Sequence, residues 1–149
     1  MSTDIFKRTT FIVADAAKAA QFYQDVFGWK IWYNNTLEAD HRFPPSGAPD
    51  KAKVHLIVLE VADPKIGKLG LLSYENPPFD TGISTKRTKV KMGETILVIN
   101  SQDVMAVYER AKKTAATIVS EPVDWKVPGP GESSDIHLKT LAMFDPNGI

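Results

Sequence analysis

The chain of 149 residues carries 18 basic and 18 acidic side chains, so its formal net charge at pH 7 is zero. A balanced charge argues against the basic surface that binds nucleic acid or anionic lipid, and it leaves a small molecule or another protein subunit as the expected partner. The chain contains no cysteine, which excludes disulfides, thiolate metal ligands and a cysteine nucleophile.

The sequence shows no secretion signal and no membrane span. Its N-terminal residues lack the apolar core of a signal peptide, and no later run approaches the roughly 18 apolar residues of a membrane helix. We therefore expect a cytoplasmic protein that binds neither membranes nor nucleic acid. Hydrophobic residues make up 43% of the chain, which is enough for the core of one domain.

A strand that runs directly into a capped helix is predicted at residues 9–28. Residues 9–13 have the β-branched and aromatic content of a short strand. Asp15 provides a carboxylate as N-cap, and the alanine-rich sequence after it has a high helix propensity. Gly28 is a typical helix stop. The apolar side chains of this helix form one stripe that can pack on a sheet: Phe22, Tyr23, Val26 and Phe27.

Three further strands are predicted in the first half of the chain, at residues 29–33, 54–61 and 69–75. The strand at 54–61 is apolar on nearly both faces, as is typical where one face meets a helix and the other lines a cavity. The polar, proline-containing stretch at 34–53 is predicted to be a long surface loop. Residues 6–77 are therefore expected to form a first module with the order β-α-β-β-β.

The second half of the chain repeats this pattern after a linker predicted at about residues 78–92, whose basic run is expected to be solvated. The repeat lies 86 positions downstream (94 − 8 = 86), so a strand at 94–100 and a helix capped by Ser101 are predicted. Residues 93–149 are expected to form the second module. The apolar face of its helix consists of Val104, Val107, Tyr108 and Ala111.

Two more strands are predicted in the second module, at 117–119 and 136–144, separated by a loop at 126–135 that is rich in proline and glycine. Residues 145–148, with the sequence Asp-Pro-Asn-Gly, are a strong turn signal, and only Ile149 follows them. A tight turn after a strand indicates that another strand comes next. We therefore expect the last strand of this module to be missing or truncated, and the natural chain to continue.

Together these features resemble the vicinal oxygen chelate superfamily, which includes glyoxalase I, bleomycin-resistance proteins and extradiol dioxygenases. The motifs that carry the resemblance are Val-x-Asp at residues 13–15, Phe-Tyr-x-x-x-Phe-Gly at 22–28 and Phe-Asp-Pro-Asn-Gly at 144–148. The resemblance implies an α+β fold in which two βαβββ modules form open, curved mixed sheets around a pocket. It also implies a homodimer.

Metal-dependent members of this superfamily have ligands at the start of each module's first strand and on each module's fourth strand. Carried over by the resemblance, these positions fall on Arg8, on Glu94 and near Leu72, with Tyr74 and Glu75 close by if the register differs, and the fourth lies beyond Ile149. A guanidinium and a hydrocarbon side chain cannot ligate a cation. We therefore expect no metal cofactor; a divalent cation, if one were bound, would involve Glu94.

The repeat makes Arg8 and Glu94 pseudo-symmetric. We hypothesise that they pair where the metal would otherwise lie, with Arg8 supplying the positive charge; the alternative is that both are surface charges at strand ends. Arg8, Leu72 and Tyr74 are then expected to contact a ligand.

Carboxylates and aromatic side chains are the other site candidates. Glu60 or Glu94 is a candidate general base in a metal-free enzyme. Trp32 and Trp125 are candidates for stacking on a flat ligand, and the alternative is that they belong to the core or to a dimer interface. Trp29, Tyr33 and Phe79 belong to the same aromatic group. The three histidines, His41, His55 and His137, lack the spacing of metal ligands.

The favoured function is the binding or sequestration of an apolar or aromatic compound. The alternative is a glyoxalase I-type lyase or isomerase, similar to lactoylglutathione lyase, that uses either a metal or a carboxylate base. An extradiol-type dioxygenase ranks last, because its iron needs two histidines and one carboxylate that the sequence does not bring together by spacing.

Overall fold

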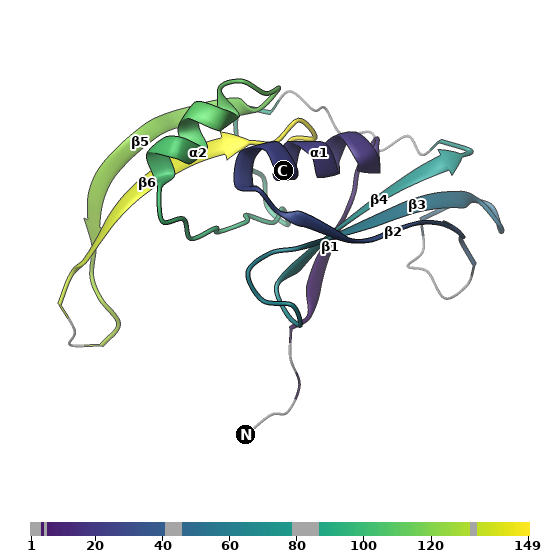
Figure 1. Ribbon diagram of the computed structural model, residues 1–149, viewed down its shortest axis with the longest axis horizontal. Helices are drawn as coiled ribbons and strands as arrows, with labels where there is room; N and C mark the ends of the chain where they lie inside the picture. The colour runs from purple at the N-terminus through teal and green to yellow at the C-terminus, as the bar shows by residue number, and fades with distance from the viewer. Residues whose placement is uncertain (1–3, 5, 41–45, 79–86, 132–133) are drawn as a thin grey trace. The chain divides into compact units, whose positions relative to one another are not determined.

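The computed structural model describes residues 4, 6–40, 46–78, 87–131 and 134–149, and it divides the chain into two compact units, residues 1–83 and 84–149. Unit 1 combines one helix with a four-stranded sheet, and unit 2 combines one helix with a two-stranded sheet (Figure 1). Both sheets are open and curved, so the predicted α+β fold class is confirmed. His41 and Phe79, and the linker residues 79–86, lie outside the described residues.

Unit 1 has the predicted β-α-β-β-β order. Its elements are β1 (Arg8–Ile12), α1 (Ala16–Phe27), β2 (Lys30–Glu38), β3 (Lys53–Glu60) and β4 (Lys68–Asn76). The sheet order is β1-β4-β3-β2, in which β1 runs parallel to β4 and the other neighbours are antiparallel. The first strand of the chain therefore pairs with the last strand of its own unit.

The strand β2 is longer than the sequence predicted. Residues 34–38, which we expected to begin a loop, continue the strand and pair with residues 53–57 of β3. Asparagine has a low strand propensity, but pairing with a strand buried on both faces outweighs that local preference. The predicted loop at 34–53 is therefore wrong for its first five residues.

The helix α1 begins and ends where its caps were predicted. Asp15 has an extended backbone, and its Oδ1 accepts a hydrogen bond from Lys18 N at 3.0 Å. This backbone donor holds the pKa of Asp15 below its ordinary value. Gly28 has a left-handed φ of 73°, and its N–H donates to Gln24 O at 2.9 Å.

The helix α1 covers one face of the unit 1 sheet. Ala16 N donates to Ser73 Oγ at 3.2 Å, which places Ser73 on the helix side of β4. Because side chains alternate along a strand, Lys68, Gly70, Leu72 and Tyr74 lie on the other side. We call that side the open face. The largest fully buried side chains among the described residues are those of Ile57, Leu59, Leu71, Val26, Val54 and Val58.

Unit 2 consists of α2 (Val104–Ala111), β5 (Thr117–Val127) and β6 (Ile136–Phe144), with β5 and β6 paired as an antiparallel hairpin. The N-cap is Asp103, whose Oδ1 accepts from Ala106 N at 2.9 Å, and not Ser101 as predicted. Ser101 instead accepts a bond from Asp103 N. Of the predicted apolar helix face, Val107 and Ala111 are buried.

The strand β5 continues well past the predicted segment 117–119. Pro122 lies inside it, where a proline would normally interrupt a strand because it lacks a backbone N–H. The pairing register shifts between Ile118 and Ser120 and again between Ser120 and Val123. Bulges of this kind leave residues out of the ladder, so they accommodate the proline.

The segment 94–100 is not a strand, although its sequence is suited to one. It keeps the alternation of an extended chain, since Leu97 and Ile99 are half-buried while Ile96 and Val98 are 68% and 94% exposed. The equivalent strand of unit 1, β1, is held by parallel pairing with β4. No strand follows β6 in the described residues up to 149, so this segment lacks the corresponding partner.

The turn predicted after β6 is confirmed. Gly148 N donates to Asp145 O at 3.0 Å, and Asn147 N donates to the Asp145 carboxylate at 2.8 Å. Neither helix in the described part of the chain has the length and hydropathy of a membrane-spanning segment.

Candidate functional site

A buried lysine at the start of β4, Lys68, contacts two other side chains at one end of the open face. Lys68 Nζ lies 3.3 Å from Glu60 Oε2 and 4.7 Å from the ring centroid of Trp32. The Lys68 side chain is only 2% exposed, whereas that of Glu60 is 33% exposed. A buried ammonium is costly unless it is paired, and here a carboxylate and the face of an indole compensate it. The structure therefore brings together two predicted site residues, Glu60 and Trp32, around a lysine that the sequence did not single out.

A β-bulge in β2 directs two aromatic side chains to the open face. Ile31 pairs with Leu59 and Tyr33 pairs with Val58, so Trp32 is an extra residue in the ladder. In a regular strand Trp32 and Tyr33 would point to opposite faces, but the bulge breaks the alternation. Their ring centroids lie 6.2 Å apart, and Trp32 is 54% exposed.

Charged residues extend from Lys68 across the strand ends. Arg8 on β1 lies in register with Lys68, and Lys30 on β2 lies in register with Glu60. Residues in register on neighbouring strands project to the same face of a sheet. The row Arg8, Lys68, Glu60 and Lys30 thus carries three positive charges and one negative charge.

At the opposite end of the open face the side chains are apolar and buried. Leu72 and Tyr74, both predicted to contact a ligand, are 7% and 5% exposed. They belong to a buried cluster with Ala39, Ala52 and Val54, and Leu37, Ala48 and Leu56 pack against it. Both side chains are therefore almost inaccessible to solvent. Whether they contact a ligand stays a prediction.

Glu94 lies in unit 2, where its carboxylate has close partners. It forms an ion pair with Arg87 and accepts a hydrogen bond from Lys91 N at 2.5 Å. Arg87 belongs to the basic run that was predicted to be solvated linker, but its side chain is only 15% exposed. The prediction of a solvated run is therefore wrong at Arg87. The hypothetical pair of Arg8 with Glu94 would join the two units and stays a prediction.

The donor atoms at the positions expected for a metal do not fit a divalent cation. The side chains of Arg8 and Leu72 offer no lone pair for coordination, and the Glu94 carboxylate is engaged by Arg87. The residues that the structure describes contain no group of three or more histidine, cysteine, aspartate or glutamate side chains that could hold a metal ion. The absence of a metal cofactor stays a prediction, which rests on the chemistry of the side chains at these positions.

His55 lies on the helix side of the sheet. It is in register with Ser73, and its Nε2 lies 2.6 Å from Asn34 Oδ1. Its Nδ1 lies 3.5 Å from Glu75 Oε1. Glu60, five residues later, contacts Lys68 on the open face, because side chains alternate along a strand. His55 thus joins three strands and does not contribute to the open face.

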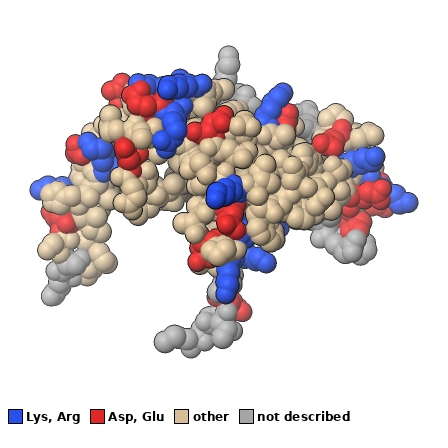
Figure 2. Space-filling model, viewed as in Figure 1, with Lys and Arg blue, Asp and Glu red and all other residues tan. Residues whose placement is uncertain are grey.

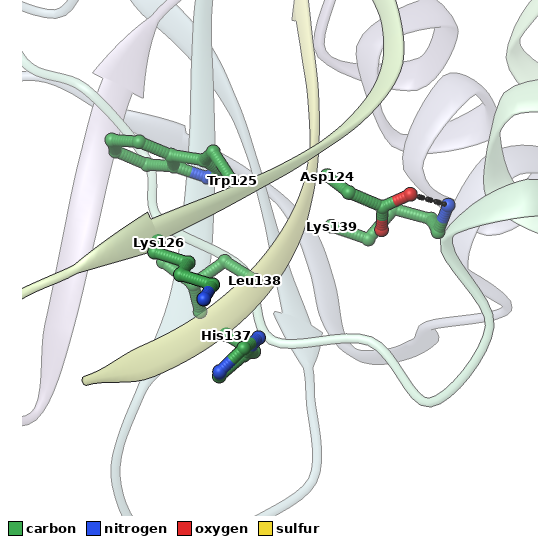
Figure 3. A pocket seen from close by; sticks show the side chains of 6 residues that line it. All are labelled: Asp124, Trp125, Lys126, His137, Leu138 and Lys139. Carbon is green, nitrogen blue, oxygen red and sulfur yellow. Dashed lines mark hydrogen bonds and ion pairs between the residues drawn. The ribbon is translucent and has the colours of Figure 1, made fainter. Parts of the chain in front are cut away.

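Trp125 lies on the β5–β6 hairpin of unit 2, in register with Leu138. The Asp124–Lys139 ion pair, with 2.8 Å between Nζ and Oδ2, points to the other side of the hairpin (Figure 3). Trp125 and Leu138 are 47% and 37% exposed, and a shallow hollow of about 470 Å³ lies along this part of the hairpin. The position of Trp125 permits stacking on a ligand, and that role stays a prediction.

Charges of both signs are interspersed on the face of the molecule drawn in Figure 2. No broad region of a single sign is visible there, which agrees with the zero net charge of the sequence.

A family model shows the family of the chain, and solved structures show proteins of similar fold. The family model described as the Glyoxalase/Bleomycin resistance protein/Dioxygenase superfamily matches residues 5–149. No curated protein has a sequence that matches the chain significantly.

Three solved structures are similar to the chain in fold. An integron cassette protein from the mobile metagenome of V. cholerae has a TM-score of 0.51 at 19% identity, covering 99% of this chain and 91% of that one. A protein from the mobile metagenome of V. pseudocholerae has a TM-score of 0.52 at 20% identity, with the same coverages of 99% and 91%. The virulence protein STM3117 from Salmonella typhimurium has a TM-score of 0.50 at 17% identity, covering 99% and 93%. At these identities the similarity concerns the fold alone.

Proposed function

Because the chain belongs to the glyoxalase/bleomycin resistance protein/dioxygenase superfamily, we propose that it binds or sequesters a small apolar or aromatic molecule on the open face of unit 1, without a metal centre. The observation that carries the proposal is the orientation of Trp32. Its indole is more than half exposed, yet Lys68 lies against one face of the ring. An exposed aromatic ring that is already fixed in position binds a flat molecule at a small cost in side-chain entropy.

The bulge in β2 supports this proposal independently of the exposure of Trp32. Bulges frequently occur next to functional sites, where they re-aim a side chain. Here the bulge adds the half-buried Tyr33 to the same face as Trp32, so that two aromatic rings with a tilt of 34° form one surface. Planar compounds are the ligands that such a surface favours.

The proposal is tested by thermal-shift and calorimetric titration with a panel of planar aromatic compounds. A ligand present at 100 times its dissociation constant raises the free energy of unfolding by about 2.7 kcal/mol, which a melting curve detects. Trp32→Leu is expected to abolish that shift. The matched control is Ile31→Ala, because Ile31 is also exposed on β2 but lies in register with Leu59 on the helix side. Ligands that bind equally well to the Trp32→Leu protein would contradict the proposal.

A glyoxalase I-type lyase or isomerase is the second candidate, and the position of Glu60 favours it. The Glu60 carboxylate is partly exposed at the aromatic end of the open face, where it could act as a base. The ion pair with Lys68 argues against a role as a base, because Glu60 Oε2 accepts a hydrogen bond from the Lys68 ammonium. A lyase assay on the wild-type protein and on Glu60→Gln, with and without divalent metal, separates the two candidates. Turnover that Glu60→Gln abolishes would support the enzyme.

We also propose a cytoplasmic homodimer, on the grounds of the cysteine-free sequence and of the superfamily. Light scattering at several protein concentrations tests the dimer. A constant mass of one chain would contradict it.

A further inference from the structure

The row of charges beside Trp32 indicates that the ligand carries a negative charge. Resting on the proposed binding function, we propose that the ligand is a flat acid whose carboxylate is bound by Arg8 and Lys68 while its ring stacks on Trp32. The proposal concerns one chemical class, a planar apolar body with a carboxylate attached.

The first argument is the charge balance of the row. Arg8, Lys68 and Lys30 are positive and only Glu60 is negative, so the row has an excess of two positive charges. Arg8 is exposed, and it forms no ion pair with any other residue in the described ranges. An anionic ligand would balance a charge that the described residues leave uncompensated.

The second argument is the environment of Lys68. An ammonium has three N–H donors, and within the described part of the chain Glu60 accepts from one of them. The face of Trp32 provides weaker compensation. Because the Lys68 side chain is 2% exposed, water screens this charge little, and a second carboxylate gains more there than at an exposed lysine.

The third argument is geometric. A guanidinium presents paired N–H donors that match the two oxygens of a carboxylate. Arg8 lies in register with Lys68, and Lys68 Nζ lies 4.7 Å from the centre of the Trp32 ring. A cationic position and a stacking surface are therefore adjacent, which is the arrangement that an aromatic carboxylate requires.

The test compares two probes with the same ring, 2-naphthoate and 2-naphthamide, by calorimetry on the full chain. The wild-type protein is expected to bind the acid at least about tenfold more tightly than the amide, and added salt is expected to reduce this preference. Arg8→Gln should lower the ratio severalfold, with the remaining preference due to Lys68, and leave the affinity for the amide unchanged. Arg110→Gln, which changes an exposed arginine on α2, is the matched control and should keep the wild-type ratio.

A second variant tests the same proposal in the opposite direction. Glu60→Gln removes the internal counter-charge of Lys68, so the affinity for 2-naphthoate should rise severalfold while that for 2-naphthamide stays constant. Equal binding of acid and amide by the wild-type protein, or an undiminished preference in Arg8→Gln, would overturn this proposal and leave the proposed binding function intact. If neither probe binds in a manner that depends on Trp32, both proposals fail for flat aromatic ligands.

Discussion

Arg87 and Glu94 form an ion pair inside unit 2, near the start of the unit. The same guanidinium donates from Nη1 to Gly148 O at 2.8 Å and lies 5.6 Å from the ring centroid of Phe144. One arginine therefore links the segment before α2 with the turn after β6. A residue that the sequence assigned to a solvated linker thus has a structural role.

Replacing Arg87 is expected to destabilise unit 2. Arg87→Gln removes the charge opposite Glu94 and the donor to Gly148, and leaving such groups unsatisfied costs about 1–3 kcal/mol of unfolding free energy. Urea denaturation followed by tryptophan fluorescence measures the effect. Lys89→Gln, at a nearby exposed position of the same basic run, is the control and should change stability by less than about 0.5 kcal/mol. Equal effects of the two variants would show that Arg87 is an ordinary surface charge.

The N-cap of α1 makes stability depend on acid pH. The Lys18 N–H lowers the pKa of Asp15 from its ordinary value of 3.8, so the stabilisation is complete above the unfolded pKa and is lost as the pH falls through the folded pKa. Asp15→Ala should cost about 1 kcal/mol at pH 7. Asp15→Asn should keep the cap and lose this part of the acid sensitivity. Thermal melts between pH 7 and pH 2 distinguish the variants, with Asp25→Asn in the same helix as the control.

Gly70 on the open face has no room for a side chain. A Cβ atom at this position would lie 2.5 Å from Thr10 Oγ1 and 3.1 Å from Thr10 Cβ. Gly70→Ala is therefore expected to destabilise the protein by about 1–3 kcal/mol through overpacking. Thr10→Ala removes the closest atom and should recover part of this loss in the double variant. Additive effects in the double-mutant cycle would contradict direct contact as the cause.

Metal analysis of the purified protein is expected to show no stoichiometric divalent cation. The reason is chemical, because Arg8 and Leu72 occupy two of the positions at which related proteins place ligands. Adding zinc or nickel should leave the melting temperature unchanged. One bound equivalent that is lost with Glu94→Gln would show that this carboxylate ligates a metal despite its pairing with Arg87.

Part of the candidate site was predictable from the sequence. Trp32, Glu60 and Arg8 were named from residue type and from the resemblance, and the structure places all three around one end of the open face. Lys68 was missed because a lysine at the start of a strand is usually solvated. Its burial depends on Glu60 and Trp32, which are distant in sequence and become its neighbours only when β2, β3 and β4 pair.

The sequence by itself determined the elements whose signals are local. Asp15 and Gly28 set the ends of α1 because each cap involves only residues within one helical turn. The tertiary structure decided what depends on strand pairing: the bulge that turns Trp32 and Tyr33 to one face, the burial of Lys68, and the fate of residues 94–100. That last segment has a strand-like sequence, yet it forms no strand because a β-strand needs a partner for its backbone hydrogen bonds, and no local pattern can supply one.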